Sequence, residues 1–213
     1  MKQKGLFVSF EGIDGCGKST QIKLLRKRLV KEKRKVIQTR EPGGTPLAEN
    51  IRNLILHTHT ETVSKETELL LYAAARAQHV STLISPNLKK GVIVLSDRFA
   101  DSMLAYQGGG RNIKTDEINK LNEFATGGLN PDITFLFDLP SKIAAIRMKK
   151  AGRKKDRMEK EGIRFQEKVR RAFLKIAASN PKRIFVVDAK LPVEVQSEIV
   201  YAAICRVSRI TAE

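Results

Sequence analysis

A glycine-rich run near the amino terminus has the residue types and spacing of a phosphate-binding loop. Residues 12–19 satisfy the pattern G-x-x-x-x-G-K-[ST]. Glycines allow a backbone wrap whose N–H groups point at phosphate oxygens, while Lys18 reaches the transferred phosphoryl group and Ser19 ligates Mg²⁺. The pattern therefore predicts an ATP and Mg²⁺ site. Its predicted ATP-binding residues are Gly12, Ile13, Asp14, Gly15, Cys16, Gly17, Lys18, Ser19 and Thr20.

The surroundings of this run agree with the motif. An apolar, β-rich segment, Leu6–Phe10, precedes it, and Gln21–Lys33 has a helical period, so a strand leads into the loop and a helix leaves it. Cys16 has no neighbouring base, which favours a small filler over a nucleophile. GTPases, motors and DNA-linked ATPases share the loop, so the motif alone leaves the phosphoryl acceptor open.

Five short apolar runs recur along the chain and alternate with segments of helical period. Near-continuous hydrophobicity is typical of strands buried on both faces, and strand–helix alternation implies parallel crossovers. We predict an α/β fold with a doubly wound five-stranded parallel sheet flanked by helices. The predicted strands are Leu6–Phe10, Lys35–Thr39, Val92–Ser96, Ile133–Asp138 and Ile184–Asp188. The predicted helices are Gln21–Lys33, Glu66–Ser85, Thr115–Ala125, Ser141–Lys150, Gln166–Ser179 and Val193–Val207.

Proline and glycine mark three loops, at Glu41–Pro46, Gln107–Asn112 and Gly127–Pro131. In open α/β sheets, ligands bind beyond the carboxyl ends of the strands, where such loops follow. No repeat or linker interrupts the 213 residues, so we predict a single domain over 1–213.

The bulk composition narrows the class of protein. Two distant cysteines indicate no disulfide framework, and apolar runs stay shorter than eighteen residues. We therefore predict a cytoplasmic protein without a membrane partner. The three histidines lack the neighbours of a zinc site.

A net charge of +17 favours polyanionic partners, whether nucleotides, nucleic acid or an anionic surface. Between residues 142 and 171, thirteen Lys and Arg residues face four Asp and Glu residues. This segment fits phosphate binding or a solvated basic surface equally well.

The sequence resembles the thymidylate kinase family over nearly its whole length, and the resemblance rests on several motifs in the right order. The matching stretches are Phe10–Thr20 (FEGIDGCGKST), Thr39–Pro46 (TREPGGTP), Leu70–His79 (LLYAAARAQH), Asp97–Gly108 (DRFADSMLAYQG) and Gly152–Glu159 (GRKKDRME). The resemblance implies a P-loop kinase with a helical lid that transfers a phosphoryl group from ATP to dTMP, and it implies a homodimer.

Asp97 and Arg98 end the third predicted strand, so their side chains would emerge beside the phosphate loop. Arg98 can pair bidentately with a phosphate and Asp97 can hold water on Mg²⁺, although an Asp–Arg surface pair is the alternative. The resemblance implies that Arg98 binds the acceptor phosphate and is catalytic together with Lys18. Ser19 and Asp97 are the predicted metal residues.

Tyr72 and Arg76 lie four residues apart, on one face of a helix. The resemblance places the ring against thymine and the guanidinium on its carbonyl, whereas Tyr72 alone would fit a core position. It also implies sugar and base contacts for Tyr106 and Gln107, where a backbone-stabilising role is the alternative. The remaining predicted substrate residues are Asp14, Glu41 and Arg52.

The resemblance implies that the basic segment around residues 142–165 is a lid, and that its Arg153 and Arg157 are catalytic cations that neutralise charge on the moving phosphoryl group. Two departures concern the base pocket: Ala75 stands where many relatives have a polar residue, and Met103 where a small polar one is usual. They leave open a kinase of another pyrimidine nucleoside monophosphate. The charge and the phosphate loop also leave open a nucleic-acid-binding ATPase and a nucleotide-sensing module without turnover, although nucleic acid is not the partner we expect.

Overall fold

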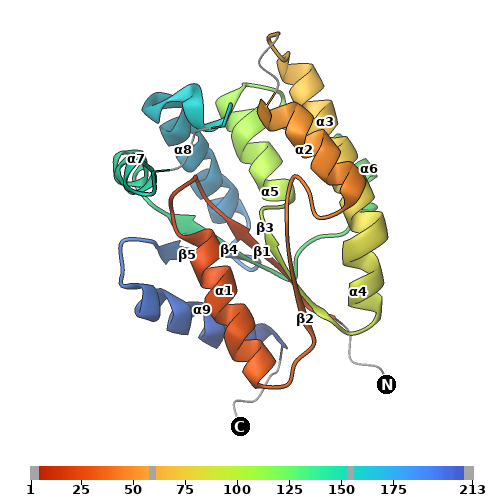
Figure 1. Cartoon of the computed structure of the whole chain (residues 1–213), viewed down its shortest axis with the longest axis vertical. Helices are drawn as coiled ribbons and strands as arrows, with labels where there is room; N and C mark the ends of the chain where they lie inside the picture. Colours follow the sequence, from red (N-terminus) through yellow and green to blue (C-terminus); the bar gives the residue numbers. More distant parts are fainter. Residues whose placement is uncertain (1–4, 58–60, 153–155, 209–213) are drawn as a thin grey trace.

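A five-stranded sheet forms the centre of the molecule (Figure 1). The computed structural model describes residues 5–57, 61–152 and 156–208. The strands pair in parallel in the order β2-β3-β1-β4-β5, which confirms the predicted doubly wound sheet. The strands are β1 (Phe7–Glu11), β2 (Val36–Arg40), β3 (Ile93–Asp97), β4 (Ile133–Asp138) and β5 (Ile184–Asp188).

Helices cover both faces of the sheet. Figure 1 shows α1 and α9 together on one side, with α2, α3 and α6 grouped away from them. The α-helices are α1 (Lys18–Lys31), α2 (Pro46–His57), α3 (Lys65–His79), α4 (Ser85–Lys89), α5 (Ala100–Met103), α6 (Thr115–Thr126), α7 (Ser141–Lys150), α8 (Ile163–Ser179) and α9 (Val193–Ser208). Two π-helical segments, Val80–Ile84 and Leu104–Gly110, continue α3 and α5, and residues 159–161 form a 3₁₀ turn.

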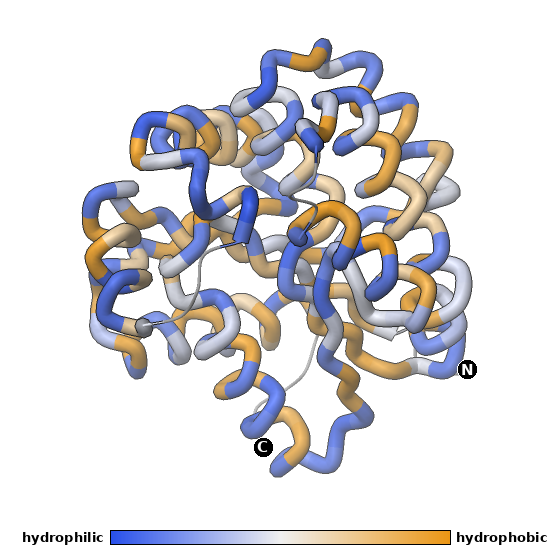
Figure 2. The backbone as a smooth tube through the Cα atoms, turned by 45° about the horizontal axis from the view of Figure 1, so that its top comes forward, coloured by the Kyte–Doolittle hydropathy of each residue, from blue (hydrophilic) through white to orange (hydrophobic). Residues whose placement is uncertain are grey.

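Aromatic side chains hold the middle of the sheet to its neighbours. Every residue of β1 is buried, because strands pair with it on both sides and helices cover both its faces. Phe7 meets Phe99 edge-on, with ring centroids 4.8 Å apart, and Phe10 stacks on Phe137. Figure 2 shows hydrophobic stretches along the strands and alternating hydrophobic and hydrophilic positions along the helices. This packing fixes where β1 and β3 end.

The carboxyl ends of the parallel strands meet at one edge of the sheet, and the site loops follow there. Phe10 pairs with Asp97 and Arg40 pairs with the same residue from the other side. The phosphate loop after β1, the Glu41–Thr45 turn after β2 and Arg98 after β3 are therefore neighbours.

Several features of the structure differ from the sequence predictions. Helix α2, which begins at Pro46, is absent from the predicted helices. The predicted Gln107–Asn112 loop is largely the π-helix Leu104–Gly110, which ends when Arg111 N–H donates to the carbonyl of Tyr106. The predicted long helix Glu66–Ser85 is helical throughout but contains the π-helical segment Val80–Ile84. The prediction of one domain over residues 1–213 remains a prediction.

The glycines of this π-helix serve close packing rather than a turn. A Cβ at Gly109 would overlap the Cβ of Ala172 on α8. A Cβ at Gly108 would lie 3.2 Å from the end of the Ile118 side chain, which can move aside. Tyr106 of this segment can therefore sit directly against Phe165 and Phe173 of α8.

We predict that Gly109→Ala lowers the free energy of unfolding by about 1–3 kcal/mol, because one added methyl group forces two helices apart. Gly108→Ala is the matched control, since it adds the same methyl group one residue away. Urea unfolding followed by circular dichroism measures both. Equal stability of the two variants would contradict the packing role of Gly109.

Candidate active site

The phosphate loop joins β1 to α1 and has its lysine turned back onto it. Gly17 has a left-handed backbone, with φ of 104°, and helix α1 begins at Lys18. The Lys18 ammonium donates to the carbonyls of Gly12 and Ile13, at 3.1 and 3.2 Å. Burial raises the pKa of the Cys16 thiol, which suits a packing residue and not a nucleophile.

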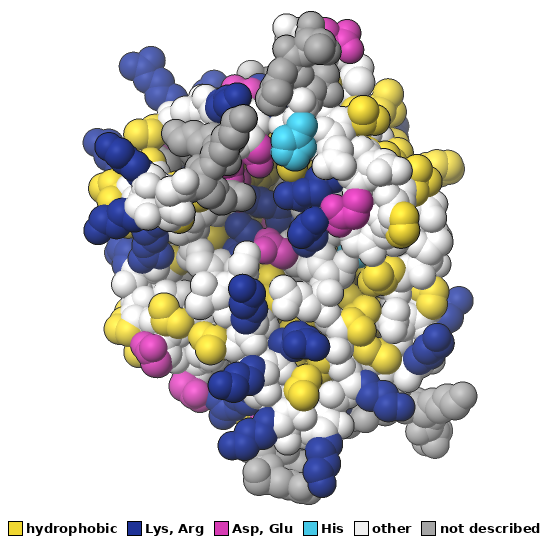
Figure 3. All heavy atoms as spheres, in the orientation of Figure 1, with side chains coloured by type: hydrophobic (Ala, Val, Ile, Leu, Met, Phe, Trp, Pro, Cys, Tyr) yellow, Lys and Arg dark blue, Asp and Glu magenta, His cyan; other side chains and the backbone are white. Residues whose placement is uncertain are grey.

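A cleft of about 760 Å³ runs along the carboxyl edge of the sheet. Figure 3 shows a hollow on this face with Lys, Arg, Asp and Glu side chains around it. The cleft brings together most of the predicted site residues: Asp14, Gly15, Cys16, Gly17, Lys18, Ser19, Thr20, Glu41, Arg52, Tyr72, Arg76, Asp97, Arg98, Tyr106 and Gln107. Gly12 and Ile13, the first two residues of the loop, are absent from the cleft lining.

Arg98 connects the end of β3 to the phosphate loop. Its guanidinium donates to the Gly12 carbonyl at 3.0 Å, to Asp14 at 2.8 Å and to the Tyr106 hydroxyl at 3.0 Å. It also donates to Ser102 and lies 4.9 Å from the Tyr106 ring centroid. The backbone of Arg98 has φ of 74°, a conformation that costs a non-glycine residue about 1–3 kcal/mol. The surrounding bonds thus hold a strained residue where its side chain faces the cleft.

Glu11 supports the backbone around Arg98 from behind. Its carboxylate accepts from the Phe99 N–H at 2.7 Å and from the Ser102 hydroxyl at 2.6 Å. Burial, with the charge of Asp101 as a second cause, raises the pKa of Glu11 to about 7. Glu11 is absent from the cleft lining, so its role is to anchor α5 beneath Arg98.

Ser19 and Asp97 bring two hard oxygen ligands together beside the loop. The Ser19 hydroxyl donates to Asp97 at 2.8 Å. Among the described residues, no group of three His, Cys, Asp or Glu side chains is arranged to hold a metal. Mg²⁺ is commonly held by one or two protein oxygens together with substrate phosphates. The pair fits a magnesium ion bound in that way.

The opposite end of the cleft holds the residues expected around a base. Tyr72 lines it with Gln107, whose amide donates to Glu68 at 2.9 Å. Burial raises the pKa of the Tyr72 hydroxyl, so the ring stays neutral. Arg52 donates to the Pro42 carbonyl at 2.9 Å, and burial lowers its pKa. The pocket can therefore surround a flat ring with an aromatic face and several donors.

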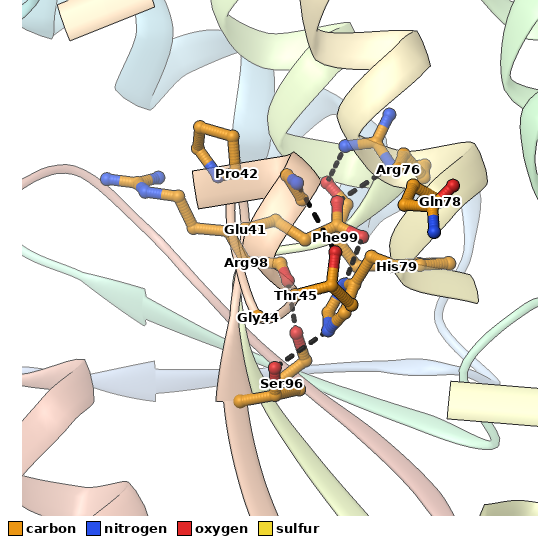
Figure 4. A network of polar contacts seen from close by, with 12 residues as sticks. Glu41, Pro42, Gly44, Thr45, Arg76, Gln78, His79, Ser96, Arg98 and Phe99 are labelled. Atoms are coloured by element: carbon orange, nitrogen blue, oxygen red, sulfur yellow. Dashed lines mark hydrogen bonds and ion pairs between the residues drawn. The ribbon is translucent and has the colours of Figure 1, made fainter. Parts of the chain in front are cut away.

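Glu41 is buried at the edge of the cleft. Its carboxylate joins Arg76 at 2.8 Å and His79 at 3.0 Å, as Figure 4 shows. Both oxygens of the carboxylate thus bond to side chains of α3. Glu41 borders the cleft, but in this structure its charge is directed at Arg76 and His79.

Of the two predicted lid arginines, the structure describes Arg157 only. Arg153 lies outside the described residues. Arg157 is absent from the cleft lining: it pairs with Glu68 at 2.6 Å and donates to the Ile55 carbonyl at 2.8 Å. In this structure Arg157 joins the segment after α7 to α2 and α3, and its catalytic role stays a prediction.

Several cleft residues are missing from the predicted site. Arg147 of α7, in the basic segment, lines the cleft and donates to the Ala189 carbonyl at 3.1 Å. The Gln21 side chain is buried beside the loop, and its oxygen accepts no hydrogen bond within the described structure. Leu191 and Val193, which follow β5, also line the cleft. Their only signal was their position directly after a strand that ends at the same edge.

Comparisons with known proteins agree with this geometry. The family model described as Thymidylate kinase matches residues 10–199. A thymidylate kinase of Thermosipho melanesiensis is 52% identical over 189 residues, which are 89% of this chain and 92% of that protein. The chain belongs to the thymidylate kinase family. A thymidylate kinase of Enterococcus faecalis is 46% identical over 94% of this chain and 96% of its own length.

A solved structure of the family has the same fold. The crystal structure of thymidylate kinase from Ehrlichia chaffeensis superposes with a TM-score of 0.76, at 34% identity, and covers 94% of this chain and 99% of its own. Family membership makes the chain a nucleoside monophosphate kinase, and it favours that function over a nucleic-acid-binding ATPase. Among the described helices, none is long and apolar enough to cross a membrane.

We predict that Arg157→Ala lowers the free energy of unfolding at pH 7 by about 1–3 kcal/mol, because Glu68 stays buried with one cation fewer. Burial would raise the pKa of Glu68, but hydrogen bonds from Gln107 and Arg111 and nearby cations hold it below its usual value of 4.5. The stabilisation is therefore present above pH 4.5 and lost as the pH falls through the lower, folded-state pKa.

Urea unfolding at pH 7 and at pH 3 measures the difference between this variant and the wild type. The difference should shrink at the lower pH. Arg164→Ala, which removes an exposed arginine of α8, is the control. A loss of stability as large in the control, or one independent of pH, would contradict the ion-pair role of Arg157.

Proposed function

We propose that this chain transfers the γ-phosphoryl group of ATP to dTMP, giving dTDP and ADP for the supply of dTTP. The observation that carries the proposal is Arg98, whose guanidinium lies between the phosphate loop and the tyrosines of the base pocket. Two nucleotides bound end to end would meet at this side chain. Transfer of this kind depends on alignment and charge neutralisation more than on a strong base.

The donor half rests on the loop and α1. ATP phosphates would compete for the Lys18 ammonium with two neutral carbonyls, and a charge-assisted bond to phosphate is the stronger one. Ser19 and Asp97 would hold Mg²⁺ with the phosphate oxygens, and the ion supplies positive charge to the β- and γ-phosphates. Arg147 and Gln21 support binding of the adenosine end.

The acceptor half rests on Arg98, Tyr106 and α3. Arg98 would bind the acceptor phosphate in exchange for its bond to Asp14, and the Asp14 carboxylate would then turn toward the sugar. Tyr106 is buried beside Arg98, where it would crowd a ribose 2′-hydroxyl and so favour deoxyribose. Tyr72 offers the aromatic face for thymine. Arg153 is proposed as the lid cation that meets the moving phosphoryl group.

A coupled ADP-release assay tests this function. With ATP and Mg²⁺, dTMP should give the largest kcat/KM in a panel that also contains dUMP, dCMP, CMP and AMP. Arg98→Lys should lower kcat/KM for dTMP by about a hundredfold or more, because a lysine cannot replace the fork of bonds. Faster turnover of another monophosphate, or ADP release that requires added DNA, would contradict the proposal.

We also propose a homodimer formed through α2, α3 and α6. These adjacent helices expose Leu47, Leu70 and Phe124, with 52%, 58% and 87% of each residue accessible. The same region carries hydrophobic side chains at the upper right of Figure 3. Exposed apolar groups in one patch indicate an interface between proteins.

Light scattering after gel filtration should give twice the chain mass of 23.9 kDa for the wild type. Leu70→Glu should shift the protein to the single-chain mass, since it places charges against each other in the interface. Ile146→Glu changes an equally exposed residue of α7 and should not. A single-chain mass for the wild type would rule the dimer out.

A further inference from the structure

A buried chain of polar contacts leads from β2 to the base end of the cleft, as Figure 4 shows in part. Thr39 Oγ1 lies 2.7 Å from His79 Nε2, His79 Nδ1 lies 3.0 Å from Glu41, and Glu41 lies 2.8 Å from Arg76. The side chains of Arg76, Glu41 and His79 are 2%, 4% and 0% exposed. Of these, Arg76 and Glu41 border the cleft.

The contacts show which ring nitrogen of His79 carries a proton. A carboxylate can only accept hydrogen bonds, so Nδ1 of His79 carries a proton and donates to Glu41. The other ring nitrogen bonds to the hydroxyl of Thr39. Since Arg76 and His79 lie three residues apart on α3, the Glu41 carboxylate meets both from the end of β2.

Arg76 has most of its hydrogen-bonding capacity in use. Its Nε donates to Glu41, Nη1 donates to Asn122 at 2.7 Å and to the sulfur of Met103, and Nη2 donates to the Phe99 carbonyl at 3.1 Å. Four of its five N–H groups thus have acceptors in the described part of the chain. One N–H of Nη2 remains for a ligand, which favours a single, well-placed acceptor such as a ring carbonyl.

The turn after β2 closes over His79. A Cβ at Gly44 would lie 2.5 Å from His79 Nε2 and 2.5 Å from Thr39 Oγ1, and Gly44 has φ of 85°. Only glycine fits both the space and the backbone conformation. The TREPGGTP motif therefore does more than form a loop: it packs directly on the imidazole and keeps water from the contacts.

We propose that His79 is a positioning residue of the acceptor site, which fixes Glu41 and through it the one free N–H of Arg76 toward a carbonyl of the base. The proposal rests on the proposed function, because the carbonyl belongs to dTMP. His79 does not touch the substrate. Loss of its Nδ1 donor would let the Glu41 carboxylate turn and would loosen Arg76, so discrimination of a ring carbonyl from a ring amino group would fall.

Two substitutions separate the two nitrogens of His79. In His79→Asn the amide nitrogen stands near Nδ1 and can still donate to Glu41. In His79→Gln the amide stands near Nε2, so the bond to Thr39 is kept and the bond to Glu41 is lost. His57→Gln is the matched control, because His57 lies exposed on α2. Steady-state kinetics with dTMP, dCMP and ATP, with thermal unfolding in parallel, measures all three.

We expect His79→Gln to raise KM for dTMP about tenfold and to lower the dTMP-to-dCMP ratio of kcat/KM by a similar factor, since it removes one hydrogen bond to a charged group. KM for ATP should stay unchanged. His79→Asn should stay within about threefold of the wild type. The proposal would be overturned if His79→Gln, His79→Asn and the wild type had equal kinetics, or if KM for dTMP and KM for ATP rose equally. His79 would then contribute to stability only.

Failures of this proposal and of the proposed function are distinguishable. If the wild-type protein does not phosphorylate dTMP, the proposed function is refuted. If it does, the positioning role predicts that KM for dTMP is higher in His79→Gln than in His79→Asn. If both His79 variants fail to fold, Thr39→Val decides, because it removes only the outermost bond. It should raise KM for dTMP by about threefold, and an unchanged KM would count against the relay.

Discussion

The site depends on one constraint, the pairing of β1 with β3 in the middle of the sheet. That pairing sets Asp97 opposite Phe10, so Arg98 emerges next to the phosphate loop. The guanidinium then bonds to Gly12, Asp14 and Tyr106, which lie in segments far apart in the sequence. Its left-handed backbone is held by the bond from its N–H to the Phe10 carbonyl. The contacts of the Arg98 side chain and N–H thus offset the cost of its strained backbone.

The high positive charge of the chain has several separate uses. Arg157 and Arg170 lie in ion pairs with Glu68 and Asp138, and Arg147 lines the cleft. Lys160 and Arg164 are exposed. The segment is therefore partly ion-paired and partly solvated, and phosphate binding by it stays a prediction. Figure 3 shows further Lys and Arg side chains over the lower part of this face, where they add a general attraction for anionic nucleotides.

The residue types and their order along the chain predicted the features that depend on local interactions, above all the positions of the strands. The predicted strands lie within one residue of the observed ones. The central strands β1, β3 and β4 are hydrophobic runs buried along almost their whole length, which leaves little choice of position. The strand positions also predicted where β1 and β3 end, and therefore that Ser19, Asp97 and Arg98 lie close together. The whole-chain resemblance supplied the base pocket, which composition and spacing alone could not have located.

Features that depend on tertiary contacts could not be predicted from the sequence. Three consecutive glycines normally mark a turn, yet close approach of α8 at Ala172 makes them part of a helix. The motif around Arg157 predicted a position at the phosphates. In this structure Arg157 pairs with Glu68, which lies far away in the sequence and carries no pattern that names its partner, and the catalytic role of Arg157 stays a prediction.

The buried ions of the base pocket are better explained by orientation than by stability. Replacing such groups with apolar residues of similar volume is often neutral or stabilising, so the pair of Arg76 and Glu41 contributes little net free energy of folding. A guanidinium that is already held at four N–H groups loses little freedom when a ligand binds. An unanchored arginine would have to be ordered by each substrate molecule. Because transfer requires the acceptor oxygen to lie in line with the γ-phosphoryl group, a fixed base at one end of dTMP places its phosphate at the other.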